Sequence, residues 1–265
     1  MGKEIGELKE GEAVTFEAFR AVIKRLRAPD GCPWDRAQTH TSLKPYMLEE
    51  SYEVLEAIDE GDMQGLSEEL GDLWLQIMLH SQIAEEQGEF SLEDVLRKIT
   101  GKLIFRHPHV FGGTGVKDAN EVSLHWQELK SREKPENSSI LAGVPKEMPA
   151  LAASQSLQRR AASVGFDWEE LDDVLGKLVE EVDELNEAGS REEQEDEFGD
   201  ILFTLANVAR KMDIDLESAL RKANSRFTRR FNHIEDACRG RGISLKDMTL
   251  AEMDGLWDEA KKKMP

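Results

Sequence analysis

The stretch EEVDELNEAGSREEQEDEFGD, residues 180–200, decides the fold of this chain. It holds eleven carboxylates and one basic residue, Arg191, and the polar break Ala188-Gly189-Ser190 divides it into two halves. Apolar residues recur at helical spacing in each half, which predicts two helices that pack together through buried stripes. The stripes consist of Leu178, Val182 and Leu185 in the first half, and of Phe198, Ile201, Leu202 and Leu205 in the second.

Acidic residues accompany both stripes in pairs. Glu181 and Glu184 are three residues apart, and so are Glu197 and Asp200. Residues three apart project from one face of a helix, about one turn from each other. Carboxylate oxygens are the ligands that hard cations prefer, so four carboxylates on two facing helices predict a site for such a cation.

The same pattern occurs in the first half of the chain. Three blocks recur in one order, namely 49–53 with 180–184, 69–72 with 197–200, and 92–98 with 216–222. This repetition indicates an internal duplication, and it aligns Tyr46 with Lys177. No strand-like alternation of useful length is present. We therefore predict an all-α fold built from two duplicated helical-bundle modules.

A proline-punctuated polar segment separates the two copies. It predicts an N-terminal module over residues 1–134, a linker over 135–148, and a C-terminal module over 149–265. Residues 29–35 are rich in turn-forming residues and predict a loop of fixed shape. In the first module Thr15 should cap a first helix over residues 16–26, and Ser91 should begin a capping box for a helix that ends at Arg106. Further helices are expected over 43–60, 63–87 and 120–134, the last of which holds Trp126.

Composition limits the ligands and the location. The chain has 265 residues, a net charge of -20 and a pI near 4.8. Nucleic acids and anionic membranes require basic faces, so neither is expected as the main partner. The longest apolar runs are too short to span a bilayer, and no signal-peptide core is evident. The two cysteines do not indicate a disulfide framework or a zinc ribbon, and we expect a cytoplasmic protein.

A basic segment stands out in this acidic chain. Residues 221–241 hold seven arginines and lysines against two acids. Lys222, Arg226 and Arg230 lie on one helical face, where they could neutralise neighbouring acidic helices or bind an anion. A cationic stripe beside carboxylates that hold Mg²⁺ fits a polyphosphate. Hydrolysis by a water that Glu180 or the metal holds would follow from such a site.

Other sites receive less support from the sequence. No P-loop, Gly-x-Ser-x-Gly or His-Glu-x-x-His motif occurs, and no histidine follows a glutamate by three residues, as a di-iron bundle would require. His107 and His109 fit loop packing better than a metal site, and Cys32 with His40 is a weaker metal pair still. For Trp257, packing in a core and stacking on a nucleobase both stay open.

Several of these blocks together resemble MazG, a family of bacterial nucleoside triphosphate pyrophosphohydrolases. The resemblance rests on the paired acidic motifs, on Gly31-Cys-Pro-Trp-Asp35 followed by Gln38-Thr-His40, and on Arg106-His-Pro-His-Val-Phe-Gly112. It covers nearly the whole chain, including the tandem arrangement. It implies cleavage of nucleoside triphosphates between the α and β phosphates, with Mg²⁺ and in a homodimer.

The resemblance also implies roles for particular residues, the C-terminal module being the main catalytic one. It implies metal ligands at Glu181, Glu184, Glu197 and Asp200. Phosphate or nucleotide contacts are implied for Lys177, Glu180, Arg226 and Arg230, and base contact for Trp257. Where family members carry a lysine before the second acidic motif, this chain has an acidic run with Glu193 and Asp196, which are the matching candidate contacts. The N-terminal copy keeps Glu50, Glu53, Glu69 and Asp72 as metal ligands.

Two rival hypotheses remain beside a broad-specificity enzyme that directs water to the α phosphorus. One is a nucleotide-sensing or partner-binding module with vestigial catalysis, which the duplication motivates. The other keeps the enzyme and narrows its substrate, for example to deoxyuridine, damaged or alarmone nucleotides. The sequence does not identify the preferred base, because it does not show which side chains contact the base edge.

Overall fold

The computed structural model describes residues 15–113, 115–118, 122, 129 and 139–263. The chain divides into two compact units, residues 1–136 and 137–265. Within the described residues every regular element is a helix, in both units. The prediction of a duplicated all-α fold is confirmed. None of the described helices is both long and apolar enough to cross a membrane.

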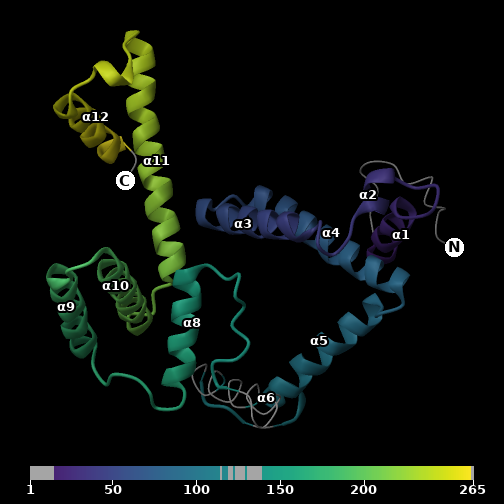
Figure 1. The fold of residues 1–265 in the computed structure, drawn as a ribbon. Coiled ribbons are helices and arrows are strands. Elements are labelled where there is room, and N and C mark those ends of the chain that lie inside the picture. The colour runs from purple at the N-terminus through teal and green to yellow at the C-terminus, as the bar shows by residue number, and fades with distance from the viewer. Residues whose placement is uncertain (1–14, 114, 119–121, 123–128, 130–138, 264–265) are drawn as a thin grey trace. The chain divides into compact units, whose positions relative to one another are not determined.

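The first unit is built on a long helical hairpin, α3 and α4, with shorter helices around it (Figure 1). Its described helices are α1 (Phe16–Leu26), α2 (Pro33–Ala37), α3 (Lys44–Glu60), α4 (Met63–Gln87), α5 (Leu92–Arg106) and α6 (Pro108–Phe111). These bounds agree with the predicted ones to within a residue or two. The helix predicted over 120–134, with Trp126, lies outside the described residues apart from two isolated positions.

Side-chain caps explain where these helices begin and end. Thr15 accepts a hydrogen bond from Ala18 N at the start of α1, and Ser91 forms the predicted capping box with Asp94 at the start of α5. Gly61 ends α3 and Gly88 ends α4, both in the left-handed conformation that glycine adopts without strain. Local sequence therefore sets the length of the hairpin.

The core of the first unit lies where α1 meets α4. It consists of Ile23, Leu43, Met78, Leu79, Ile83 and Leu92. Arg27, whose side chain is only 7% exposed, pairs with Glu86 of α4 at 2.8 Å and also donates to the carbonyl of Asp35. The segment before α3 is thereby held against α1 and α4.

The segment 29–35 differs from the predicted loop, because α2 begins at Pro33 within it. Proline suits the first turn of a helix, where its missing N–H would have no intrahelical partner. The turn before it is tight: a Cβ at Gly31 would lie 2.3 Å from the carbonyl oxygen of Leu26. The expectation of a loop throughout is wrong, and the expectation of a fixed shape stays a prediction.

The second unit repeats the hairpin as α9 and α10. Its described elements are α8 (Ala150–Ala162), α9 (Leu171–Glu187), α10 (Arg191–Lys211), α11 (Leu216–Arg241), the short 3₁₀ helix η2 (Leu245–Asp247) and α12 (Leu250–Lys263). The predicted break at 188–190 is the turn between α9 and α10, and Ser190 caps α10 with a capping box. Buried glutamines tie α8 to its neighbours: Gln158 donates to the carbonyl of Phe203 in α10, and Gln155 donates to that of Ile214 in the turn between α10 and α11.

The predicted burial of the two apolar stripes is wrong for four of their seven residues. Leu178, Leu185 and Ile201 are half-buried. The exposed ones are Val182 at 42%, Phe198 at 55%, Leu202 at 43% and Leu205 at 37%. The face of α10 that packs inward carries Thr204, Ala206, Asn207 and Ala209 instead, because it is the face that meets α8. The hairpin forms as predicted and leaves part of its apolar surface uncovered.

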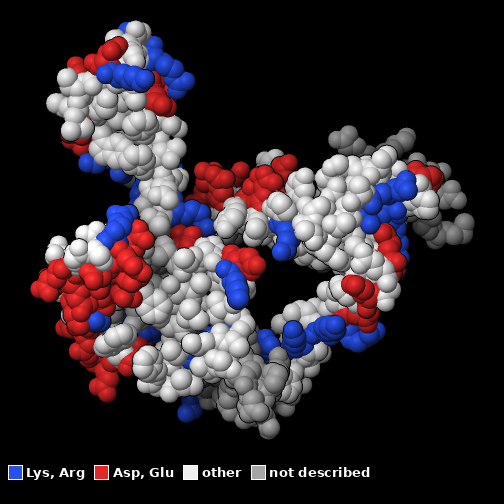
Figure 2. Space-filling model, viewed as in Figure 1, with Lys and Arg blue, Asp and Glu red and all other residues white. Residues whose placement is uncertain are grey.

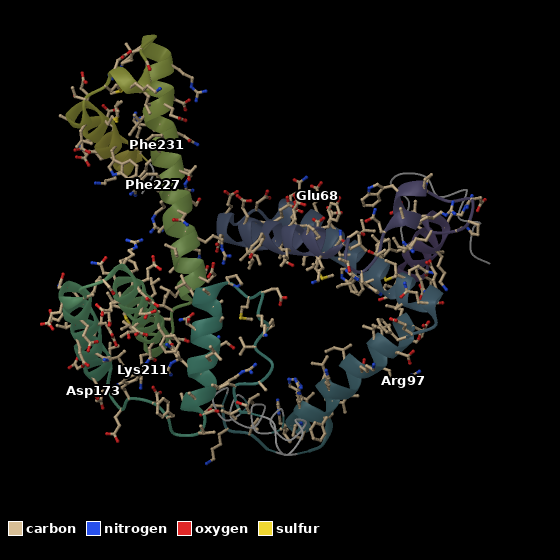
Figure 3. The ribbon with its side chains drawn as sticks, in the orientation of Figure 1. Glu68, Arg97, Asp173, Lys211, Phe227 and Phe231 are labelled. Atoms are coloured by element: carbon tan, nitrogen blue, oxygen red, sulfur yellow. The ribbon has the colours of Figure 1, made fainter. Side chains whose placement is uncertain are left out.

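The C-terminal part of α11 packs on α12 and has a core of its own. Ile234, Cys238, Met248 and Leu256 are buried in it. Phe227 and Phe231 stack in parallel at 6.0 Å on α11, and Figure 3 places both at the level of α12. This small core fixes Trp257 of α12 against α11.

Candidate functional site: two carboxylate clusters

Three carboxylates converge from the hairpin of the second unit. Glu181 and Glu184 of α9 and Glu197 of α10 each offer an oxygen within 4.8 Å of the others. Glu181 is only 5% exposed, Glu197 is half-buried and Glu184 is exposed. Figure 2 shows the surrounding surface of α9 and α10 densely covered by acidic side chains. The three oxygens form a set that could hold a hard cation.

Lys177 lies one turn before this cluster on α9. Its Nζ is 2.7 Å from Glu180, 3.0 Å from Glu181 and 3.9 Å from Glu184. Hydrogen bonds to Glu180 and Glu181 hold the pKa of Lys177 above its usual range. The lysine stays charged and partly neutralises the cluster.

The cluster is nevertheless electrostatically strained. Desolvation by its neighbours raises the pKa of Glu184, the charge of Lys177 opposes this shift, and Glu181 and Glu197 add to it. A bound cation would relieve this repulsion. The arrangement therefore combines acidic ligands with a positive group beside them.

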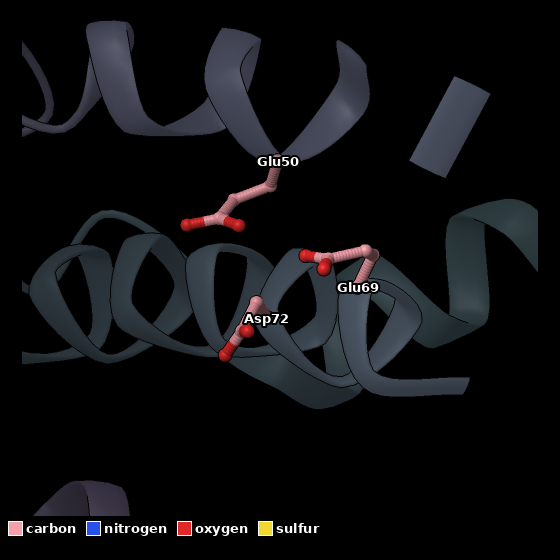
Figure 4. A group of neighbouring side chains, drawn as sticks. All are labelled: Glu50, Glu69 and Asp72. Carbon is pink, nitrogen blue, oxygen red and sulfur yellow. The ribbon is translucent and has the colours of Figure 1, made fainter. Parts of the chain in front are cut away.

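The first unit contains a matching cluster. Glu50 of α3 and Glu69 and Asp72 of α4 bring carboxylate oxygens within 4.8 Å of one another. In Figure 4 the side chain of Glu50 extends from α3 toward α4, which carries Glu69 and Asp72. Both helices of the hairpin contribute, as in the second unit.

The charge balance of this cluster is different. Partial burial is the largest cause that raises the pKa of Glu50, and the negative charges of Asp72 and Glu53 raise it further. The pKa of Glu69 is also raised, first by burial and then by Glu53 and Asp72. Among the described residues, the main causes of both shifts are desolvation and carboxylates, with no cation among them. At the position that matches Lys177, Tyr46 packs edge-on against Trp34 with ring centroids 5.9 Å apart.

Not every predicted ligand belongs to these groups of three. Glu53 stands beside the first group, where its carboxyl raises the pKa values of Glu50 and Glu69. Asp200 is outside the second group. Within the part of the chain that the structure describes, Arg226 and Arg230 form no ion pair with the acids of α9 and α10.

Two further predicted contact residues have local structural partners. Trp257 is half-buried, lies 5.3 Å from Phe227 and has the Arg230 guanidinium 5.8 Å from its ring. It therefore packs in the small core and keeps part of its surface open. Glu193 accepts hydrogen bonds from the backbone of Gly189 and Ser190 as part of the capping box, whereas Asp196 is exposed. The predicted nucleotide contacts of these residues stay predictions.

Some polar groups near the site were not anticipated. Asp167 pairs with Arg210 and Lys211, which ties the segment before α9 to the end of α10. Figure 3 shows Lys211 at that end. A spacing of more than forty residues gives no sequence signal for such a clamp. The buried Gln155 could have been noticed only as a polar residue on an otherwise apolar helix face.

Comparisons with known proteins agree with this architecture. Residues 38–111 match the model of the MazG nucleotide pyrophosphohydrolase domain, and residues 154–227 match that of phosphoribosyl-ATP pyrophosphohydrolase. Each match includes the acidic cluster of one unit. The two matches follow each other as the internal duplication does.

Similar proteins extend the likeness over nearly the whole chain. A nucleoside triphosphate pyrophosphohydrolase/pyrophosphatase MazG of Thermotoga maritima is 43% identical, over 94% of this chain and 96% of its own length. A nucleoside triphosphate pyrophosphohydrolase of Escherichia coli K12 is 39% identical, over 94% and 97%. The uncharacterized protein YabN of Bacillus subtilis is 49% identical over 93% of this chain, which spans 52% of YabN.

Two helical hairpins, each with three converging carboxylates, define a duplicated all-α protein with acidic centres suited to a hard cation. With relatives of this identity and coverage, the family is established as well. The chain belongs to the MazG family.

Proposed function

We propose that this chain is a nucleoside triphosphate pyrophosphohydrolase, which converts a nucleoside triphosphate and water into a nucleoside monophosphate and diphosphate. The observation that carries this proposal is the convergence of Glu181, Glu184 and Glu197 beside Lys177. It occurs in a chain whose relatives of matching length carry that activity in their names. The proposed specificity for the base is broad.

The donor set fits Mg²⁺ as the cofactor. All three groups are carboxylates, and the pKa of Glu184 is raised by desolvation first and then by Glu181 and Glu197, whose repulsion a cation would reduce. Glu181, Glu184 and Glu197 would hold the ion, with Asp200 as a fourth ligand from the next turn of α10. When bound, the cation supplies Lewis-acid stabilisation of charge on the phosphate oxygens.

The remaining residues of the second unit would bind and orient the reactants. Glu180 is exposed beside the cluster and would orient and deprotonate the water that attacks the α phosphorus. The bond to the α–β bridging oxygen breaks, and diphosphate leaves. Lys177, Arg226 and Arg230 would neutralise phosphate charge, and Trp257 would contact the base. Glu193 and Asp196 remain the weaker candidates for nucleotide contact.

For the first unit we propose cation binding with little turnover. Glu50, Glu53, Glu69 and Asp72 supply the oxygens, whereas Tyr46 leaves the cluster without the lysine of the second unit. The same difference favours the rival function, a nucleotide-sensing module with vestigial catalysis, for this unit. The two functions differ in their products, since a sensor binds nucleotide and releases no diphosphate.

We further propose that the protein works as a homodimer in the cytoplasm. Val182, Phe198, Leu202 and Leu205 leave an apolar surface on the second hairpin, which a second copy would cover. The acidic composition suits a soluble protein with nucleotide and cation ligands.

Matched double variants test the proposal. The double variant Glu181→Gln, Glu184→Gln removes two charges from the cluster of the second unit. The double variant Glu50→Gln, Glu53→Gln changes the two matching positions of the first unit. We expect diphosphate release from a panel of triphosphates to fall at least about 100-fold in the Glu181, Glu184 variant and to change little in the Glu50, Glu53 variant. Product identification by chromatography distinguishes diphosphate from phosphate. Unchanged release by the first variant, with helicity retained, would contradict the metal site.

A further inference from the structure

Two histidines meet outside both carboxylate clusters. His40, in the segment before α3, and His80, on α4, bring their Nδ1 atoms to 2.7 Å from each other. Both side chains are half-buried, and they are forty residues apart in sequence. His80 is eight residues beyond Asp72 on α4, which is roughly 12 Å along the helix axis. The pair is therefore separate from the first cluster.

The two imidazoles approach edge to edge. Their ring planes are 8° from parallel, and their centroids are 5.0 Å apart. This separation is close to the Nδ1 to Nδ1 distance plus one ring radius on each side, so the nitrogens point along one line. Two imidazoles in contact through their faces would have their nitrogens directed elsewhere. In this arrangement one nitrogen must donate a proton and the other must offer its lone pair.

A metal ion competes for the same lone pairs. Neutral imidazole nitrogen is a preferred ligand of zinc and its neighbours in the first transition row. Burial, with a smaller effect from His40, lowers the pKa of His80, which keeps this ring neutral. A tetrahedral zinc ion with bonds of 2.0–2.1 Å needs its nitrogens roughly 3.3 Å apart. Because the two nitrogens now point at each other along one line, each ring would turn by roughly 35° to aim its lone pair at an ion with tetrahedral angles.

A buried polar residue, Gln76, lies one turn earlier on α4. Gln76 is 5% exposed, and its Oε1 is buried without a hydrogen-bond partner among the described residues. Gln76 and His80 are four residues apart and therefore share one face of the helix. A buried amide oxygen without a partner is costly, and a cation would satisfy it. The sequence neighbours of His40, Thr39 and Thr41, are exposed.

We propose that His40 and His80, with Gln76 as third donor, form a binding site for a first-row transition-metal ion such as Zn²⁺. The site joins the segment before α3 to the middle of the long helix α4. Its nitrogen ligands distinguish it from the oxygen-only clusters, which suit Mg²⁺. The bound ion would pin residues 38–43 onto α4 and so fix the first turn of α3.

Zinc titration of the full chain tests the site, with Mg²⁺ in excess to occupy the carboxylate clusters. We expect calorimetry to detect zinc binding that weakens at least about 10-fold in His80→Asn and in His40→Asn. His233→Asn serves as the matched control, because His233 lies on α11 in the other unit, near Glu259. Gln76→Leu should weaken binding less than either histidine variant.

A second measurement needs no variant. In the unaltered protein, zinc should shift the Nδ1 resonances of two imidazoles, assigned to His40 and His80, in nitrogen-15 spectra. Unmoved resonances would overturn the proposal. Equal zinc affinity in the unaltered protein and in folded His80→Asn would also overturn it, by assigning the zinc to the carboxylates. If a variant fails to fold, as circular dichroism would reveal, the spectra of the unaltered protein decide.

Discussion

The two carboxylate clusters share a framework and differ in one charge. In each unit a helical hairpin brings together acids of a Glu-Glu-x-x-Glu motif and a Glu-x-x-Asp motif. One turn before the first motif, the second unit has Lys177 and the first unit has Tyr46. Lys177 pairs with Glu181 and Glu184 of its cluster and with the neighbouring Glu180, whereas Tyr46 packs against Trp34.

This difference teaches that cluster geometry and charge balance are set by separate positions. The acidic motifs fix which carboxylates meet, because the spacing of each motif fixes the helix face. The position one turn earlier decides whether the protein itself supplies a counter-charge. A cluster without one, such as that of Glu50, Glu69 and Asp72, depends on an external cation to relieve its repulsion.

Exchange of the two residues should have the largest effect. We expect Lys177→Tyr to lower kcat for diphosphate release about 100-fold, because the substrate phosphates lose one positive group in the site. The separate single variant Tyr46→Lys should leave turnover nearly unchanged. Steady-state kinetics on a triphosphate panel would measure both. Comparable losses from both variants would mean that the two clusters contribute equally to the reaction.

Addition of Mg²⁺ should protect the two hairpins from hydrogen exchange to different extents. We expect Mg²⁺ to slow amide hydrogen exchange more in α3 and α4 than in α9 and α10, because only the second hairpin has an internal counter-charge. A site saturated to 100 times its dissociation constant gains about 2.7 kcal/mol. Glu69→Gln should remove the effect in the first hairpin alone. Equal protection of both hairpins would show that Lys177 does not substitute for the ion.

The dependence of stability on pH gives a third test, without Mg²⁺. The pKa values of Glu50 and Glu69 are raised in the folded protein, so the folded state binds protons more tightly than the unfolded state. The stability from these protons is fully present below the ordinary glutamate pKa and is lost as pH rises through the raised values. Hydrogen exchange in α3 and α4 should therefore quicken over that range in chelator.

A Glu50→Gln, Glu69→Gln double variant is the control for this pH effect. Glutamine does not titrate, so exchange in the first hairpin should change less with pH in the variant. If protection of the first hairpin fell equally with rising pH in the variant and in the unaltered protein, the pH effect would belong to other carboxyls.

Much of the fold follows from local sequence, because local chemistry fixes it. Thr15, Ser91 and Ser190 are caps that a short window reveals, and Gly61 and Gly88 end helices for a reason confined to one residue. The convergence of three acids in each hairpin also follows, since helix periodicity and a short turn are sufficient to bring them together.

Long-range contacts did not follow from the sequence. The face of α10 that would be buried was predicted from its large apolar residues, yet Phe198 is 55% exposed and the small residue Ala206 is fully buried. Contact with α8, which is more than forty residues away, selects that face. The His40–His80 contact is equally distant in sequence. No local pattern encodes which distant helix covers a given face.

The smallest expected effect concerns the caps of the two helices that carry the Glu-x-x-Asp motifs. Asp62 caps α4 by accepting hydrogen bonds from Gln64 N and Gly65 N, and Ser190 caps α10 by accepting one from Glu193 N. Loss of such a cap costs about 1 kcal/mol, so Asp62→Ala and Ser190→Ala should lower stability by similar amounts. Denaturant unfolding monitored by hydrogen exchange would measure each hairpin separately.

Because Ser190 leads into the helix of Glu197, frayed first turns of α10 should also weaken Mg²⁺ binding in the second unit slightly. A cost confined to one unit would show that the two hairpins, alike in sequence pattern, are not held by the same local interactions.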